Sequence, residues 1–423
     1  RRRLAVRVSS AYAEAVVREA AARLRLAVDA AAPLQWADFQ EVDWDGLLAD
    51  GGHRRRCSCL YLRAGLVRKA MLAHYLAKRR AAGVLPEGVV VDLEDEADLA
   101  DLRRQLEERQ AGAAPGARGR PLWIAKASCS NRGEHIFLAR SAEEAVEALR
   151  PAVLEEGIAE WVVQRYISPP LLLGGRKFHV RAHFLVSGCP RCGTTSAWLH
   201  AGSHVVLVAG EAYGEGAGER LSHLTNHCLQ AADPRYDEGS QTLLLGELDA
   251  AAAREGLAAH ALAEMAGALS RALAAAASAP ATFAPLPQCF ELFGADFVLE
   301  DRGTGAPGVW LLEVNSGPDL SVFGSRLRPQ CVELVEAVLR VAVEPFLGRS
   351  PAGDFADPKG CGCASRALRS GFGECLWSCG PRTGSGAEEL SGFKRRISLA
   401  GKWAKALHEG SSIAVRGPQG RVG

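Results

Sequence analysis

The chain has 423 residues, of which 48% are hydrophobic and 23% are charged, and this balance is typical of a folded globular protein. Its 50 Lys and Arg residues against 49 Asp and Glu residues give a formal charge of +1, which argues against a strongly basic nucleic-acid-binding protein. No stretch approaches the roughly 20 uninterrupted apolar residues of a membrane helix, so we expect a soluble, intracellular protein.

Residues 1–85 have the pattern of a small N-terminal α/β domain. The run LAVRVS (4–9) is strand-like, and a helical pattern follows over about 12–26. Further on, apolar residues at helical spacing, with basic residues on the opposite side, predict a second helix over about 66–80. We expect a new unit to begin at Pro86.

The second predicted unit covers residues 86–165. It opens with a short buried strand, GVVVDL (88–93), and a charged, exposed helix over 97–110. The Gly- and Ala-rich segment 111–121 predicts a flexible loop.

Strands dominate the third predicted unit, residues 166–348. Together with strands at 122–126 and 160–167, the expected strands of this half of the chain are 176–186, 195–201, 205–210, 289–300 and 308–314. Two Ala-rich helices are expected between about 241 and 279, and one more over about 329–346. After residue 349 the chain is rich in Gly, Ser, Arg and Cys without a sustained apolar period, so we expect 349–423 to be a disordered tail.

The motif WLLEVNSGPD (310–319) carries the clearest signal of chemistry. Because side chains alternate along a strand, Leu311, Glu313 and Asn315 should share one face, and Asp296 lies on the preceding apolar strand. Two carboxylates and an amide buried at the end of a hairpin need compensation, and oxygen ligands of this kind suit Mg²⁺. The alternative is a surface hairpin with polar ends.

A row of cation-capable residues lies in the run GGRKFHVRAHFLV. Lys177, His179 and Arg181 fall on one strand face in steps of about 7 Å, a suitable row for a polyphosphate or an acyl phosphate. The alternative is the solvated face of an antiparallel sheet.

Two further segments could contact a nucleotide. Lys126 precedes a loop of small residues, SCSNRG, whose backbone N–H groups can approach phosphate, although an ordinary hairpin connection fits equally well. The segment HLTNHCLQ (223–230) matches no compact zinc pattern, so hydrogen bonding to substrate or phosphate is the better functional interpretation.

Taken in order, the motifs WIAK, VVQRYI, RKFHVR, HLTNHCLQ, ELFGADF and LLEVN resemble the tubulin–tyrosine ligase family, a branch of the ATP-grasp fold. The resemblance covers roughly residues 60–347. It implies an α/β protein of the ATP-grasp fold, with mixed and antiparallel sheets flanked by helices, a small N-terminal α/β domain and a disordered C-terminal tail.

The resemblance also implies roles for individual residues. The ATP phosphates would be contacted by Lys69, Lys126 and Lys177, and the adenine pocket would be lined by Gln164, Arg165, Tyr166 and Ile167. Nucleotide and substrate binding would also involve His179, His223, Thr225 and Asn226. Mg²⁺ would be held by Asp296, Glu313 and Asn315. Arg181 would stabilise the transferring phosphoryl group, so that Arg181, Lys177 and Glu313 form the catalytic set.

The function that the resemblance implies is ATP- and Mg²⁺-dependent ligation of an amino acid, tyrosine in the first instance, to the C-terminal carboxylate of a protein such as α-tubulin. The expected partners are tubulin or another protein with an acidic tail and the free amino acid, with no nucleic acid and no membrane, in the cytoplasm or on microtubules. Addition of glutamate or glycine is one alternative. A degenerate binding module is another, because the hairpin 196–210 lacks an Arg that the family usually carries and His179 stands where these ligases usually have Asp.

Overall fold

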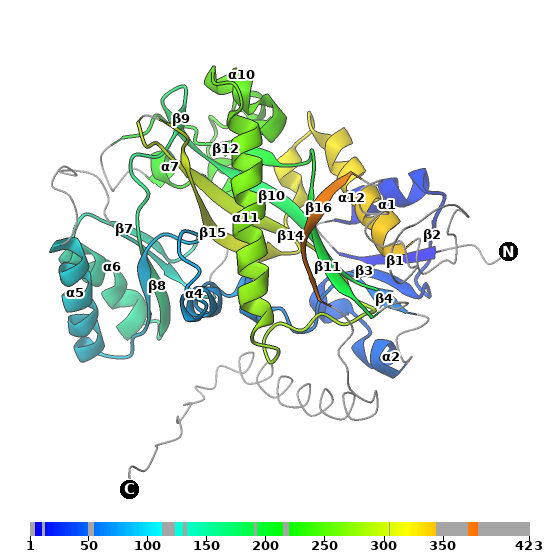
Figure 1. Ribbon diagram of the computed structural model, residues 1–423, viewed down its shortest axis with the longest axis horizontal. Coiled ribbons are helices and arrows are strands. Elements are labelled where there is room, and N and C mark those ends of the chain that lie inside the picture. The colour runs from blue at the N-terminus through cyan, green and yellow to red at the C-terminus, as the bar shows by residue number, and fades with distance from the viewer. Residues whose placement is uncertain are drawn as a thin grey trace, which may run out of the picture. The chain divides into compact units, whose positions relative to one another are not determined.

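Three β-sheets follow one another along the chain (Figure 1). The computed structural model describes residues 5–10, 13–49, 55–111, 123–129, 133–189, 193–214, 220–303, 305–343 and 371–379, all of which belong to one compact unit that ends at residue 380. Helices flank a parallel sheet and two antiparallel sheets, so the predicted α/β class is confirmed.

The first sheet is parallel, with the strand order β2-β1-β3-β4. Its strands are β1 (Ala5–Ser9), β2 (Ala27–Val28), β3 (Leu34–Ala37) and β4 (Arg56–Cys57), with the helices α1 (Glu14–Arg23), η1 (Phe39–Glu41) and α2 (Trp44–Ala49) between them. Because the strands are parallel, the carboxyl ends of β1, β3 and β4 meet at one edge of the sheet.

The helix predicted over 66–80 is interrupted. The structure has α3 (Ala64–Val67) and α4 (Lys69–Lys78), separated by Arg68 in an extended conformation. The first N–H groups of a helix lack partners within the helix. Here the Ala70 N–H donates to Ser128 Oγ of the second sheet at 3.2 Å, so a distant side chain completes the start of α4.

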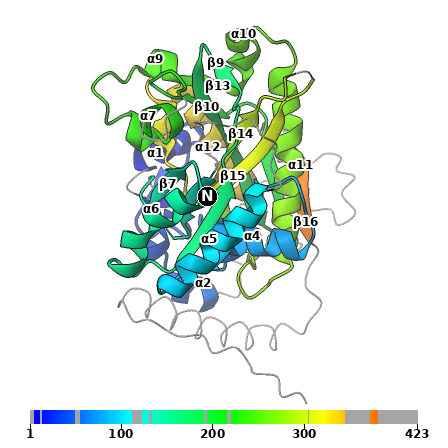
Figure 2. The ribbon, with the colours of Figure 1, turned by 90° about the vertical axis from the view of Figure 1, so that its left-hand side faces the viewer.

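The second sheet is antiparallel, with the order β5-β8-β6-β7. It consists of β5 (Gly88–Asp92), β6 (Trp123–Ala127), β7 (Ile136–Ala139) and β8 (Glu160–Arg165), accompanied by α5 (Glu96–Ala111) and α6 (Ala142–Leu154). The two helices pack side by side against one face (Figure 2), which leaves the opposite face for the site described below.

The third sheet is antiparallel and is organised around the long strand β10. Its strands are β9 (Leu172–Leu173), β10 (Arg176–Gly188), β11 (Thr195–His200), β12 (Val205–Val208), β13 (Thr242–Leu244), β14 (Phe290–Glu300), β15 (Gly308–Ser316) and β16 (Phe372–Cys379). β10 pairs with β9, β11, β12 and β14, and β15 pairs with β14.

Helices cover both faces of this sheet (Figure 1). α11 (Leu257–Ala277) packs on the face that carries Phe178, Phe184 and Phe293, whereas α12 (Arg328–Val343) packs with α1 on the other. The remaining short helices are α7 (Arg220–His223), α8 (His227–Gln230), α9 (Glu238–Gln241), η2 (Leu245–Glu247), α10 (Leu248–Ala252) and η3 (Leu320–Phe323). Among the described helices, none combines the length and apolarity needed to cross a bilayer.

Part of the predicted tail is ordered. The sequence predicts disorder from residue 349, but β16 pairs antiparallel with β11, with Ala197 opposite Trp377 and Ser196 opposite Ser378. Phe372 is buried in the core beneath α12. A short apolar segment is enough to add an edge strand, although the composition around it is polar. The other residues of the predicted tail, and the predicted loop from residue 112, lie outside the described residues.

Candidate active site

One face of β10 carries the predicted row of cation-capable side chains. Lys177, His179 and Arg181 alternate with Phe178 and Val180, which are buried in the core on the α11 side. The alternation predicted from the sequence is therefore present. All three polar side chains are largely buried, so the row is not a solvated sheet face.

The three predicted metal ligands converge beside this row. Asn315 Nδ2 lies 3.3 Å from Asp296 Oδ2 and 3.2 Å from Glu313 Oε1. Asp296 and Glu313 are directly opposite each other on β14 and β15. The acidic pair is mostly buried, so it is not a polar end of a surface hairpin.

The predicted face of Leu311 is wrong. Asp296 is opposite Glu313, but the next pair joins Phe297 to Leu311, so Leu312 is an extra residue in β15. Such a bulge shifts the alternation by one residue. Leu311 and Val314 consequently both lie in the core, while Glu313 faces the site.

Each carboxylate of the site is held by a cation. Arg181 Nε and Nη2 donate to Asp296 Oδ1 and Oδ2 at 2.8 and 2.7 Å, a bidentate pair. Lys69, the first residue of α4, lies with its Nζ 3.2 Å from Glu313 Oε2. Burial opposes ionisation of Asp296, but the guanidinium of Arg181 lowers the pKa of that carboxyl below its usual value.

The donor set fits Mg²⁺. Two carboxylates and an amide supply hard oxygen ligands, and Mg²⁺ normally takes the rest of its octahedron from water and phosphate oxygens. Among the described residues, no three His, Cys, Asp or Glu side chains are grouped closely enough to form an all-protein metal cage. The arrangement is therefore suited to a cation that arrives with a phosphate ligand, with Asp296, Glu313 and Asn315 as the residues that would hold it.

Two lysines of the site are buried more deeply than lysines usually are. Burial, with a smaller contribution from the nearby charge of Lys126, lowers the pKa of Lys177 to about 7. The pKa of Lys126 is lowered to about 8, also by burial, with Glu313 acting in the opposite direction. Among the described residues, the four cationic side chains of Lys69, Lys126, Lys177 and Arg181 lie around the carboxylates of Asp296 and Glu313, with Asp319 further away, so the fully protonated site has an excess of positive charge that suits a polyanion.

A polar chain positions Lys177. Its Nζ donates to the Tyr166 hydroxyl at 2.7 Å and to the His223 carbonyl oxygen at 2.9 Å. The Tyr166 hydroxyl lies 2.8 Å from His223 Nδ1. Next to this chain, His179 Nδ1 lies 2.6 Å from Thr225 Oγ1, and burial lowers the pKa of His179 to about 4.

The four predicted adenine-pocket residues do not share one environment. Gln164 is buried and lines a cavity of about 540 Å³ between α4, β5 and Trp310 of β15. Arg165 donates to Glu300 Oε1 at 3.2 Å, and its guanidinium lies 5.6 Å from the centre of the Trp310 ring. Tyr166 contributes its hydroxyl to the Lys177 chain instead, and Ile167 is buried.

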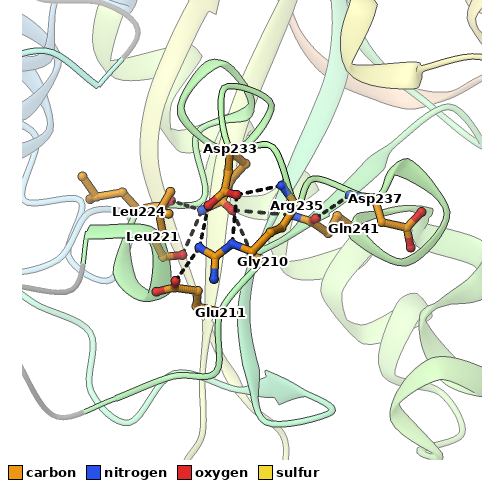
Figure 3. A network of polar contacts seen from close by, with 9 residues as sticks. Gly210, Glu211, Leu221, Leu224, Asp233, Arg235, Asp237 and Gln241 are labelled. Carbon is orange, nitrogen blue, oxygen red and sulfur yellow. Dashed lines mark hydrogen bonds and ion pairs between the residues drawn. The ribbon is translucent and has the colours of Figure 1, made fainter.

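The segment that carries His223 and Thr225 is held by a separate polar network (Figure 3). Gln230 Nε2 donates to the carbonyl oxygens of Leu221 and Leu224 at 2.9 and 2.7 Å, and Gln230 Oε1 accepts from the Gly210 N–H at 2.8 Å. Close by, Arg235 pairs with Asp233 and Glu211. These contacts tie the segment to the end of β12 and explain how the short helices keep their place.

The small-residue loop after β6 lies against the same segment. Asn226 lies beside Gly133: a side-chain carbon placed at Gly133 would be 3.5 Å from Asn226 Cγ. At the other end of the loop, Cys129 Sγ accepts from Arg68 Nη2 at 2.8 Å. Residues 130–132 lie outside the described residues.

Sequence reasoning missed one position that the site requires. A side-chain carbon at Gly294 would lie 2.9 Å from Pro318 Cβ and 3.4 Å from Arg181 Cδ, so only glycine allows both groups to approach. The signal was a single glycine inside an otherwise apolar strand, which often marks a close approach.

The sequence model of the tubulin-tyrosine ligase family matches residues 66–350, more than half of the chain. A probable tubulin–tyrosine ligase of Schizosaccharomyces pombe is 29% identical over 362 residues, which are 75% of this chain and 84% of that protein. The inactive polyglycylase TTLL10 of Homo sapiens is 30% identical over 253 residues, which are 53% of this chain but only 35% of that protein.

A solved structure shows the same fold. The C-terminal domain of K. lactis Pby1, described as an ATP-grasp enzyme that interacts with the mRNA decapping enzyme Dcp2, superimposes with a TM-score of 0.58 at 22% identity. The match covers 84% of this chain and 97% of that domain. The predicted ATP-grasp fold is thus confirmed.

Proposed function

Since the chain belongs to the tubulin–tyrosine ligase family, we propose that it is an ATP-dependent ligase that joins the amine of an amino acid to a protein carboxylate. The preferred amino acid is tyrosine, and the preferred acceptor is the C-terminal carboxylate of a protein with an acidic tail, such as α-tubulin. The similarity to the Schizosaccharomyces pombe protein named a probable tubulin–tyrosine ligase supports this choice.

One observation carries the proposal. Asp296, Glu313 and Asn315 meet within hydrogen-bonding distance directly beside Arg181. A magnesium nucleotide needs oxygen ligands for the cation next to cationic side chains for the phosphates, and this arrangement supplies both.

The chemistry follows from the charges. A carboxylate does not react with an amine, so it must first be activated. An oxygen of the acceptor carboxylate attacks the γ-phosphorus of ATP, the bond between that phosphorus and the β,γ-bridging oxygen breaks, and ADP leaves with its electron pair. The amine nitrogen then attacks the acyl carbon, the carbon–oxygen bond breaks with its electron pair leaving on inorganic phosphate, and the proton lost by the amine passes to that phosphate as the amide forms.

Side chains of this site would assist both steps by electrostatics and positioning, without a covalent enzyme intermediate. Arg181, already oriented by its bidentate contact with Asp296, would take the transferring phosphoryl oxygens. Lys177 and Lys126 would hold the other phosphates. Bound Mg²⁺ would neutralise charge on the phosphates as a Lewis acid.

The substitution Glu313→Gln tests this assignment. It keeps the size of the side chain but removes an anionic ligand, so we expect ATP-dependent incorporation of labelled tyrosine to fall by at least about 100-fold, the scale of losing one electrostatic contact in a transition state. The matched control is Glu333→Gln on the exposed face of α12, which should keep full activity.

Thermal unfolding of both variants checks that the fold is retained. Full activity of a folded Glu313→Gln variant would remove the metal-site assignment, whereas a folded, unmodified chain that incorporates no amino acid would contradict the ligase proposal.

A degenerate, non-catalytic nucleotide-binding module is the second candidate. The relative named an inactive polyglycylase supports it, as does the absence of an Arg from 196–210. Two assays together separate the ligase from the binding module. Incorporation of labelled tyrosine, glutamate or glycine measures ligation, and a thermal-shift titration with Mg-ATP measures nucleotide binding. A ligand that binds only the native state raises its stability. A shift without incorporation of any of the three amino acids favours the binding module.

A further inference from the structure

A second cavity, of about 220 Å³, lies where the N-terminal sheet meets the end of β15. Its wall includes Ser10, Asp38 and Ser58, and each of these directly follows one of the parallel strands β1, β3 and β4. Ligands of open α/β sheets bind outside the carboxyl ends of the strands. None of the residues predicted for the nucleotide or metal site lines this cavity.

The cavity adjoins the reaction centre described above. Ser316, Gly317 and Pro318 form part of its wall and directly follow the metal-ligand candidate Asn315. Pro318 Cβ and Arg181 Cδ both lie close to the position that a side-chain carbon at Gly294 would take, at 2.9 and 3.4 Å. A molecule held in the cavity would therefore lie next to the place where Arg181 meets the phosphoryl group.

The cavity wall carries both signs of charge. Arg63 Nη1 lies 2.5 Å from Glu291 Oε1, and the Glu291 side chain is only 2% exposed. Glu291 Oε2 also accepts from the Leu60 N–H at 2.8 Å, and Asp38 supplies a second carboxylate to the wall.

One guanidinium and two carboxylates match a zwitterion. A carboxylate can pair with the planar fork of Arg63, and an ammonium group can pair with the acidic side chains. Burial raises the pKa of Glu291 to about 7, so a bound ammonium group would favour its ionised form, whereas an acidic peptide would oppose it and would also be repelled by Asp38.

Apolar side chains complete the cavity. Trp36, Phe39 and Leu292 line it, and the Arg63 guanidinium lies 4.7 Å from the centre of the Phe39 ring. A site with a charged end and aromatic walls suits an amino acid with a large apolar or aromatic side chain.

We propose that this cavity binds the free amino acid of the ligation, with Arg63 contacting its α-carboxylate and Glu291 and Asp38 contacting its α-ammonium group. The inference rests on the proposed ligase function, because that function requires an amine substrate beside the acyl phosphate. It adds Arg63, Asp38 and Glu291 to the substrate-binding residues, none of which belongs to the predicted nucleotide site.

Two substitutions test the cavity in the full chain. Arg63→Lys keeps a positive charge beside Glu291 but removes the planar fork, and Asp38→Asn removes one carboxylate. Their matched controls are Arg18→Lys on the exposed side of α1 and Asp45→Asn on α2. L-tyrosine, L-glutamate and glycine are each titrated calorimetrically into the protein in the presence of Mg-ADP.

We expect L-tyrosine to bind the unmodified chain, and each cavity substitution to weaken its Kd at least tenfold while the Kd for Mg-ATP stays within twofold. The two controls should bind like the unmodified chain. Should Arg63→Lys fail to fold, as judged by thermal unfolding, Asp38→Asn alone decides.

The outcomes separate this inference from the ligase proposal. Amino-acid binding that weakens in the cavity variants, without any incorporation, supports the cavity and contradicts the ligase function. Incorporation with an unchanged KM for the amino acid in the cavity variants contradicts the cavity and leaves the ligase function in place. The inference is also overturned if none of the three amino acids binds. It is overturned as well if the cavity substitutions leave amino-acid binding unchanged and an acidic acceptor peptide displaces the amino acid, because the cavity would then not be its site.

Discussion

Lys177 lies deep in the site, and its Nζ donates to the Tyr166 hydroxyl and the His223 carbonyl oxygen rather than to a carboxylate. Burial disfavours the charged form of a lysine unless an anion compensates it. The carboxylates of the site contact Arg181 and Lys69 instead. The side chain is thus positioned to hold a ligand anion, and its charge depends on whether that anion is bound.

Nucleotide binding should therefore take up protons. The pKa of Lys177 is about 7 in the ligand-free site, so the side chain is mostly neutral at pH 8. The triphosphate raises this pKa, which means that binding at pH 8 draws protons from the buffer. Affinity for ATP should be greatest below about pH 7 and should fall as the pH rises through the raised pKa of the complex.

Calorimetric titrations of Mg-ATP at pH 8 in two buffers with different ionisation enthalpies measure the number of protons taken up. The Lys177→Arg variant, which stays charged without ligand, should take up fewer protons than the unmodified chain. Binding by the unmodified chain without proton uptake would contradict the burial argument for Lys177.

At the scale of elements, the sequence was most informative where one face of a strand is buried. The alternation in RKFHVR placed Lys177, His179 and Arg181 correctly, because the core side of β10 is uniformly apolar. The pattern in WLLEVN gave the convergence of Glu313 and Asn315 but not the bulge at Leu312, since an extra residue is decided by pairing with β14 and leaves no local mark.

Features that depend on distant partners were not predicted. At the break between α3 and α4, the Ala70 N–H donates to Ser128 Oγ, which follows a strand of another sheet. The edge strand β16 depends on the edge of β11, about 180 residues earlier in the sequence, and on a core that accepts Phe372. Local periodicity contains neither piece of information.

The substitution Phe372→Ala tests whether β16 belongs to the folded molecule. Phe372 is 2% exposed, so truncation should lower the free energy of unfolding by about 3–5 kcal/mol, as for other buried phenylalanines. Ser378→Ala removes only the hydroxyl that contacts Ser196 and should cost about 1 kcal/mol. Denaturant unfolding measures both changes, and equal, small effects would mean that β16 does not dock.

At the scale of the whole molecule, Arg56 connects three elements that are far apart in the sequence. From β4 its Nη2 donates to Ser187 Oγ at 3.1 Å and to the Gly188 carbonyl oxygen at 2.6 Å, both at the end of β10, and its Nη1 donates to the Ala342 carbonyl oxygen of α12. Arg56 is 1% exposed. The N-terminal sheet that forms part of the proposed amino-acid cavity is thereby fixed to the sheet that carries the proposed metal ligands.

Replacing Arg56 should weaken the whole molecule more than replacing its neighbour. Arg56→Met leaves buried carbonyl groups without their charged donor, and we expect a loss of about 3–5 kcal/mol in the free energy of unfolding, the range for removing one partner of a buried charged contact. Arg55 is the matched control, because its side chain is 42% exposed and pairs with Asp43 at the surface, so Arg55→Met should change stability by less than about 1 kcal/mol. Urea unfolding of both variants gives the comparison. Similar losses for the two would show that Arg56 does not join the sheets, and the N-terminal sheet would then need another anchor beside the active site.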